Sequence, residues 1–141
     1  MMSQVFVSGH KSPDTDSIAA ALSYSYLKRR LGMDAVAVRA GEINKESRFA
    51  LDYFNLEEPI LVTSVERKNP EDEKQKVILV DHNESKQTID GMDDAEVLEI
   101  IDHHRFGDFE SENPIFILVR PVGCVNTVIY GLYKTNHIKP S

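Results

Sequence analysis

The chain has 141 residues, enough for one domain with a buried core, and carries 23 acidic against 16 basic residues, a formal net charge of -7. This acidic balance argues against a nucleic-acid or anionic membrane surface, and the apolar runs are too short for a membrane span or a signal peptide. A single cysteine, Cys124, excludes an internal disulfide and a cysteine-rich zinc module. We therefore expect one soluble, cytoplasmic domain, with Cys124 as a small core residue.

The first strand leads into a loop with three ligand-type side chains. Residues 5–7 are β-branched or aromatic and predict a strand, and a helix with alanine and leucine on one stripe follows over 17–31. His10, Asp14 and Asp16 lie between them, at the strand end where open α/β sheets carry their sites. An imidazole with two carboxylates suits a borderline-to-hard metal ion. The simpler interpretation is that Asp14 or Asp16 caps the helix and that His10 is a solvated loop residue.

The remaining elements alternate between strand and helix. Helices are expected after Asn44, where aromatic residues recur at helical spacing, and over 123–134, whereas the charged segment 64–76 predicts a mobile surface insertion. Apolar runs predict strands near 4–8, 35–39, 60–62, 77–80, 97–101 and 115–119. We therefore predict an α/β fold, doubly wound, with a mainly parallel sheet of five to six strands and helices on both faces.

Ligand-type residues follow three of these strands. They are His10, Asp14 and Asp16 after the first strand, Asp81 after 77–80, and His103 and His104 after 97–101. Because the carboxyl ends of parallel strands with right-handed crossovers open on one face, we expect these six side chains to converge. That many ligands suits two divalent ions roughly 3.5–4 Å apart, a pair that serves phosphoryl hydrolysis, with Asp81 as the bridging carboxylate. We interpret His82 as a structural histidine and Glu84 as a helix-start or surface charge.

Four segments carry these residues: GHKSPDTDSI (9–18), DHNE (81–84), DHHR (102–105) and PVGC (121–124). Together with RAG (39–41) and FALDYF (49–54), they closely resemble the signatures of family II, manganese-dependent inorganic pyrophosphatases in the DHH phosphoesterase superfamily. The resemblance runs along nearly the whole chain. It implies a DHH-domain-like fold and a metal-dependent phosphohydrolase.

The resemblance also assigns roles to residues. In the family, residues matching His10, Asp14 and Asp81 hold one metal ion, and residues matching Asp16, Asp81 and His103 hold the other. The counterpart of His104 contacts the substrate, so Asp81 and His104 are the implied catalytic residues. Two ions of Mn²⁺ or Co²⁺ are implied, because imidazole ligands favour them over Mg²⁺, and a further Mg²⁺ can arrive with the substrate.

The implied reaction is hydrolysis of inorganic pyrophosphate to two phosphates. Residues 1–141 resemble the family's amino-terminal domain, so we expect a single metal-binding domain that lacks the family's carboxy-terminal, substrate-binding domain. We therefore expect the chain alone to bind metal but to hydrolyse pyrophosphate slowly or not at all. The strand 115–119 is similar to the one through which the family forms a homodimer; no nucleic-acid or membrane partner is expected.

Two other functions remain open. One is a DHH-type phosphodiesterase that acts on short oligonucleotides or cyclic dinucleotides, and the other is a non-catalytic metal-binding or dimerising fragment. The sequence PDTD at 13–16, together with DHNE at 81–84, favours the pyrophosphatase, because the phosphodiesterase branch tends to carry an Asp-Gly-Asp type of first motif.

Overall fold

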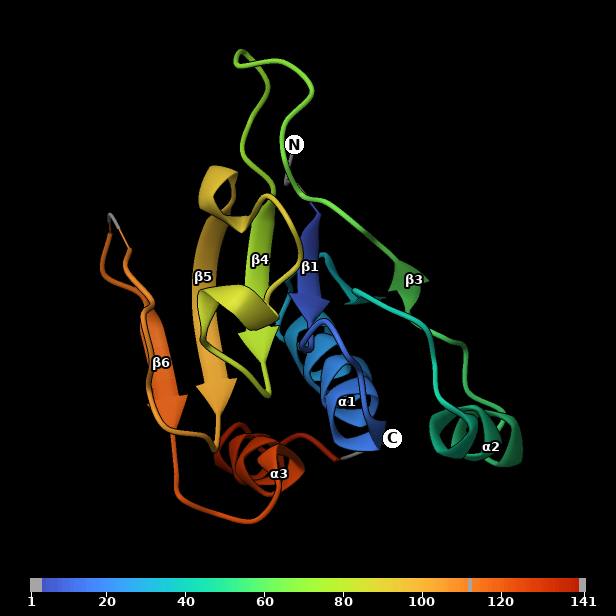
Figure 1. Ribbon diagram of the computed structural model, residues 1–141. Helices are drawn as coiled ribbons and strands as arrows, with labels where there is room; N and C mark the ends of the chain where they lie inside the picture. Colours follow the sequence, from blue (N-terminus) through green and yellow to red (C-terminus); the bar gives the residue numbers. More distant parts are fainter. Residues whose placement is uncertain (1–3, 112, 140–141) are drawn as a thin grey trace.

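The computed structural model describes residues 4–111 and 113–139 and shows a six-stranded sheet. Every pair of neighbouring strands is parallel, in the order β3-β2-β1-β4-β5-β6 (Figure 1). The strands are β1 (Val5–Ser8), β2 (Ala35–Arg39), β3 (Ile60–Leu61), β4 (Lys76–Val80), β5 (Glu96–Asp102) and β6 (Phe116–Val119). The predicted strands are confirmed, with ends that shift by a single residue at most.

Helices connect or follow these strands. In the described residues they are α1 (Thr15–Arg30), α2 (Lys45–Tyr53), α3 (Val125–Thr135) and the short 3-10 helices η1 (Ser85–Gln87) and η2 (Met92–Asp94). α1 begins before the predicted residue 17, because the side chain of Asp14 accepts a hydrogen bond from the Ser17 backbone N–H at 2.8 Å and caps the helix. Asn44 caps α2 in the same way.

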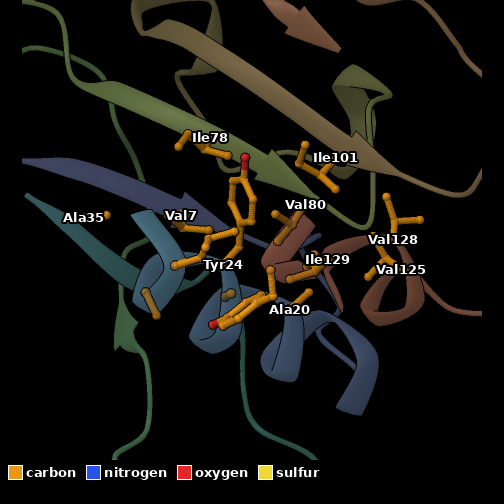
Figure 2. Packing of buried hydrophobic residues seen from close by; sticks show 14 of the residues in the cluster. Val7, Ala20, Tyr24, Ala35, Ile78, Val80, Ile101, Val125, Val128 and Ile129 are labelled. Atoms are coloured by element: carbon orange, nitrogen blue, oxygen red, sulfur yellow. The ribbon is translucent and has the colours of Figure 1, made fainter. Parts of the chain in front are cut away.

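One face of the sheet is covered by α1 and α3, which pack against each other as well as on the strands. Figure 2 shows Tyr24 of α1 and Ile129 of α3 packed with Val7, Val80 and Ile101 from the central strands. These strands have neighbours on both sides and side chains buried on both faces, which explains their nearly continuous apolar sequences.

The opposite face is covered without an α-helix. Its buried residues are Val38, Val65, Val77, Leu79, Ile89 and Ile100. Val65 and Ile89 come from connecting segments, and η2 adds the partly buried Met92. The α/β doubly wound class is confirmed, but the helices on this face are single 3-10 turns, because the β4–β5 connection begins with residues of the candidate site and is interrupted at Gly91, whose φ of +81° is left-handed.

The segment 64–76, predicted as a surface insertion, is anchored at two points. Val65 is buried in the core on the sheet face opposite α1 and α3, and the guanidinium of Arg67 binds the Asp94 carboxylate at 2.8 Å. The anchored part therefore belongs to the packed structure of the domain.

The helix predicted after Asn44 is confirmed, but its aromatic residues do not enter the core. α2 buries Ser47 and Leu51, whereas Phe49 and Tyr53 are 70% and 72% exposed. The neighbouring strand β3 has two residues, so the sheet offers little surface for α2 to cover. No helix in the part of the chain that the structure describes combines the length and apolar character that crossing a bilayer requires.

Candidate metal centre

The candidate site lies where the order of the strands reverses, between β1 and β4 of the all-parallel sheet. β1 leads to β2 on one side, and its other neighbour β4 leads to β5 on the opposite side. Such a switch point leaves a crevice at the carboxyl ends of the two strands, where α/β proteins bind ligands. Gly9 and His10 follow β1 at this edge, and Asp81 follows β4.

His10, Asp14 and Asp81 form a first ligand group. One donor atom from each lies within 4.8 Å of the others, with His10 Nε2 at 3.7 Å from Asp14 Oδ2 and 3.5 Å from Asp81 Oδ2. The structure thus brings together the three side chains predicted for one ion. Asp81 is 2% exposed, whereas Asp14 is exposed at the mouth of the site.

Asp16, Asp81 and His103 form a second group beside the first. His103 Nε2 lies 3.0 Å from Asp81 Oδ1 and 3.7 Å from Asp16 Oδ2. Asp81 therefore presents one oxygen to each histidine, the arrangement that a bridging carboxylate requires. Imidazole and carboxylate donors at these separations fit divalent transition ions such as Mn²⁺.

The backbone of Asp81 is strained. Its φ of +63° is in the left-handed region, which non-glycine residues adopt mostly at special sites. The Ser17 hydroxyl donates a hydrogen bond of 2.9 Å to Asp81 Oδ2 and holds the side chain in place. Gly9 makes room for Ser17, since a Cβ on Gly9 would lie 2.7 Å from the Ser17 Cβ. The sequence identified Ser17 only as a helix start, so this role was missed.

Asp14 both caps α1 and faces the site. Its Oδ1 accepts the hydrogen bond from the Ser17 N–H, and its Oδ2 is the oxygen nearest His10. The two interpretations offered by the sequence are therefore compatible, because each uses a different carboxylate oxygen.

Asp16 is held by residues at the start of α3. Its carboxylate accepts hydrogen bonds from Cys124 Sγ at 2.8 Å, the Val125 N–H at 3.2 Å and Asn126 Nδ2 at 2.6 Å. Partial burial raises the pKa of Asp16, but these hydrogen bonds outweigh burial and leave its pKa below the usual value. The prediction of Cys124 as a core residue is wrong, because the thiol is partly exposed and faces Asp16.

The pKa values of His10 and His103 are both raised, and a hydrogen bond fixes the orientation of the His103 ring. The Asp81 carboxylate raises the pKa of His10 above its ordinary value. Burial lowers the pKa of His103, but its contacts with the Val122 carbonyl and Asp81 more than offset burial and raise it. His103 Nδ1 donates to the Val122 carbonyl at 2.9 Å, which leaves Nε2 toward the carboxylates. A metal ion must displace protons from both rings, so acid should weaken binding.

His104 is oriented by a carboxylate that the sequence interpretation passed over. Asp102 is fully buried, and its Oδ1 lies 2.7 Å from His104 Nδ1, while Asn83 Nδ2 donates to its Oδ2 at 2.8 Å. Donor atoms of Asp81, Asp102, His103 and His104 also lie within 4.8 Å of one another. The position of Asp102, directly before the two histidines, could have indicated this role.

His82 is buried rather than exposed at the site. Its Nδ1 donates to the Val80 carbonyl at 2.8 Å, its Nε2 has no hydrogen-bond partner, and burial lowers its pKa to about 4. The neutral, buried ring agrees with a structural histidine.

Two cations near the site each lie beside a carboxylate: the Lys11 ammonium pairs with Asp90, and Arg105, which is largely exposed, lies 3.5 Å from Glu84.

Comparisons with known proteins show the family to which the chain is similar. Residues 4–141 match the DHH family, N-terminal domain. Proteins of an Exiguobacterium species and of Bacillus licheniformis, each named a probable manganese-dependent inorganic pyrophosphatase, are 49% identical over 138 residues, 98% of this chain and 43% of each relative. This chain therefore spans less than half the length of the curated relatives it matches.

Two solved structures share the fold. A crystal structure from Methanococcus jannaschii, described as a candidate family II inorganic pyrophosphatase, has a TM-score of 0.81 and 38% identity over 95% of this chain and 40% of its own. An exopolyphosphatase-related protein from Bacteroides fragilis has a TM-score of 0.63 at 16% identity, over 94% of this chain and 39% of its own. The second similarity concerns the fold alone.

Proposed function

The chain belongs to the DHH family, as an N-terminal domain, and from that premise we propose that it carries the two-metal centre of a manganese-dependent inorganic pyrophosphatase. The observation that carries the proposal is the position of Asp81. Its two oxygens face His10 and His103 at 3.5 Å and 3.0 Å, so two ligand groups share one buried carboxylate. The names of the relatives favour manganese and pyrophosphate.

We assign His10, Asp14 and Asp81 to a first Mn²⁺ or Co²⁺ ion and Asp16, Asp81 and His103 to a second. Two ions bound there would activate water at neutral pH and would neutralise charge on the attacking and leaving oxygens of pyrophosphate. A further Mg²⁺ accompanying the substrate remains part of the proposal. Mixed imidazole and carboxylate ligands favour Mn²⁺ over Mg²⁺ at the protein's own sites.

The chain's own residues would orient the substrate and move a proton. Asp102 holds His104 through Nδ1, so that Nε2 of this half-exposed ring is available to a bound phosphate. We propose that His104 donates a proton or hydrogen bond to the leaving phosphate. Ser17 and Asn83 keep Asp81 and Asp102 in position, so neither carboxylate has to reorganise during the reaction.

We propose that residues 1–141 form one metal-binding domain and that most cations that grip pyrophosphate lie elsewhere in the whole protein. Lys11 and Arg105 lie near the proposed site, each beside a carboxylate, Asp90 and Glu84, and two such partly neutralised cations are too few to clamp a highly charged substrate. The relatives are more than twice as long as the matched region, which leaves room for such a clamp. A homodimer through β6 also belongs to the proposal.

The test measures phosphate released from pyrophosphate by the 141-residue chain with and without Mn²⁺, beside cleavage of a cyclic dinucleotide. We expect hydrolysis of pyrophosphate by the chain alone to depend on Mn²⁺ and to be well below the turnover of typical enzymes, about 1–10³ per second, or absent, and we expect no dinucleotide cleavage. Faster cleavage of the dinucleotide would favour the phosphodiesterase. Tight Mn²⁺ binding with no turnover of either substrate would mean that this chain alone is not catalytic, as expected if the substrate clamp lies elsewhere in the whole protein, and absence of Mn²⁺ binding would reject the two-metal centre.

A further inference from the structure

We propose that Asn126, in the first turn of α3, is a positioning residue that orients Asp16 for the second ion. The inference rests on the proposed two-metal function, and it assigns a role to a side chain that does not itself ligate metal. Asn126 Nδ2 donates to Asp16 Oδ1 at 2.6 Å and to the Asp16 backbone carbonyl at 3.2 Å. One amide group thus binds both the side chain and the main chain of the same residue.

The amide is itself held in one orientation. The Ser23 hydroxyl of α1 donates to Asn126 Oδ1 at 3.3 Å, so the oxygen of the amide faces Ser23 and the NH₂ group faces Asp16. α3 is anchored to the same part of α1, because the Tyr133 hydroxyl donates to the Ser23 carbonyl. The orientation of Asp16 therefore depends on how α3 packs against α1.

These contacts divide the two oxygens of Asp16 between two tasks. Oδ1 accepts from both Cys124 Sγ and Asn126 Nδ2, whereas Oδ2 accepts the longer bond from the Val125 N–H and lies 3.7 Å from His103 Nε2. Oδ1 is thus engaged by the protein, and Oδ2 remains for an ion shared with His103. Hydrogen bonds to a ligand carboxylate fix its geometry and its charge.

The segment 122–126 also orients the other ligand of the second ion. The Val122 carbonyl accepts from His103 Nδ1 at 2.9 Å and directs Nε2 toward the carboxylates. The first ion depends on different support, since Asp14 is held by the Ser17 N–H at the start of α1. Loss of the Asn126 amide should therefore weaken the second ion and spare the first.

The experiment titrates the 141-residue chain with Mn²⁺ and records electron paramagnetic resonance spectra. The signal of unbound Mn²⁺ measures how much metal has bound and therefore gives the affinity of each site. Two ions roughly 3.5–4 Å apart also give a spin-coupled spectrum, which a single bound ion does not. For Asn126→Ala we expect the second ion to bind about 10–100-fold more weakly, the usual effect of removing an outer-shell partner, and the first ion to change less than about threefold. The coupled spectrum should appear only at correspondingly higher Mn²⁺.

Two further variants separate positioning from a general effect on folding. Asn136→Ala removes the same side chain from the other end of α3, where its amide donates to the Leu132 carbonyl, and should leave both affinities unchanged. Ser23→Ala frees the Asn126 amide to rotate and should weaken the second ion in the same direction but less. It also tests the inference if Asn126→Ala does not fold.

Each outcome bears on a different claim. Equal second-ion affinity in wild type, Asn126→Ala and Ser23→Ala would overturn the positioning role while leaving the two-metal function intact. Equal losses of affinity for both ions in Asn126→Ala would also overturn the positioning role, because a general structural change affects both ions alike. A wild-type chain that never shows a spin-coupled pair would reject the two-metal function itself.

Discussion

Asp81 faces both proposed ions, since its Oδ2 lies 3.5 Å from His10 and its Oδ1 3.0 Å from His103. Asp81→Asn should weaken the binding of both Mn²⁺ ions, because it removes an anionic ligand from each. The loss of affinity should exceed the roughly 10–100-fold that follows removal of a residue supporting a ligand. Asparagine tolerates the left-handed backbone that Asp81 adopts at φ +63°, so the fold should persist. Calorimetric titration with Mn²⁺ measures both affinities.

Asp34→Asn is the matched control for Asp81→Asn. Asp34 is exposed and precedes β2, at the opposite end of the strands from the site, so its replacement should leave Mn²⁺ binding unchanged. Equal effects of the two substitutions would mean that only the net charge of the domain matters. Loss of one ion alone in Asp81→Asn would mean that Asp81 does not bridge.

His82 should make the stability of the metal-free chain depend on pH. Burial lowers its pKa to about 4, against 6.5 for an unperturbed histidine. At this residue the unfolded state binds more protons than the folded state between these values, so the contribution of His82 to stability is retained above pH 6.5 and is lost as the pH falls toward 4. Because one pKa unit corresponds to about 1.4 kcal/mol, the free energy of unfolding should fall by about 2 kcal/mol at pH 5 through this residue.

Urea unfolding in the presence of a chelator at pH 7 and pH 5 measures this contribution. His82→Asn should remove it, so that the variant loses less stability than wild type over this interval. His137→Asn replaces an exposed histidine and should keep the wild-type profile. An unchanged pH dependence in His82→Asn would show that the buried ring does not titrate in this range.

At the level of elements, the start of α1 combines a helix cap with a proposed ligand. Asp14→Asn keeps a side-chain oxygen for the Ser17 N–H, whereas Asp14→Ala removes it. In the presence of a chelator, Asp14→Ala should lower the free energy of unfolding by about 1 kcal/mol, and Asp14→Asn should lower it by about 0.3 kcal/mol at most. Both should weaken the first Mn²⁺ ion, because both remove the carboxylate near His10.

Chemical denaturation and Mn²⁺ titration of the two Asp14 variants distinguish the roles. If Asp14→Asn keeps wild-type Mn²⁺ affinity, Asp14 is a cap and not a ligand. If Asp14→Ala unfolds no more easily than Asp14→Asn, the cap contributes little and the packing of α1 against the sheet determines its stability.

At the level of the whole molecule, both edges of the sheet expose apolar side chains. On β6, Phe116 and Ile117 are 49% and 44% exposed, and on β3 Leu61 is 47% exposed. An unprotected edge strand favours pairing with another chain, and we predict a homodimer through β6. Ile117→Lys should convert a dimer to a monomer in sedimentation, whereas Leu61→Lys should not. A wild-type monomer at every concentration would reject the dimer, and a monomer from Leu61→Lys alone would place it at the β3 edge.

Mn²⁺ should stabilise the whole domain, because metal-free Asp14, Asp16 and Asp81 bring like charges together at one sheet edge. At about 100 times its dissociation constant, a ligand that binds the folded state contributes about 2.7 kcal/mol, or about 5–10 °C in the melting temperature. Calorimetric scans should show this rise and its reversal by a chelator. Mg²⁺ at the same concentration should give a smaller shift, and an equal shift would indicate an all-oxygen site without the histidines.

The strands, the cap of α2 and the ligand types at the strand ends could be predicted from the sequence alone. The apolar run in β4 and the capping residue Asn44 depend on neighbours in the chain, so local patterns reveal them, whereas the sequence left the cap of α1 open between Asp14 and Asp16. The family signatures extended this to the grouping of His10, Asp14 and Asp81 and of Asp16 and His103, which the structure brings together.

The residues that support those ligands become apparent only in the folded protein. Asn126 meets Asp16 across 110 residues of sequence, Cys124 faces the same carboxylate instead of the core, and both contacts exist because α3 packs on α1. The aromatic residues of α2 are exposed because β3 is too short to bury them, a fact that helical spacing cannot reveal. Local sequence specifies which elements form, whereas contacts between distant elements depend on the free energy of packing the whole chain.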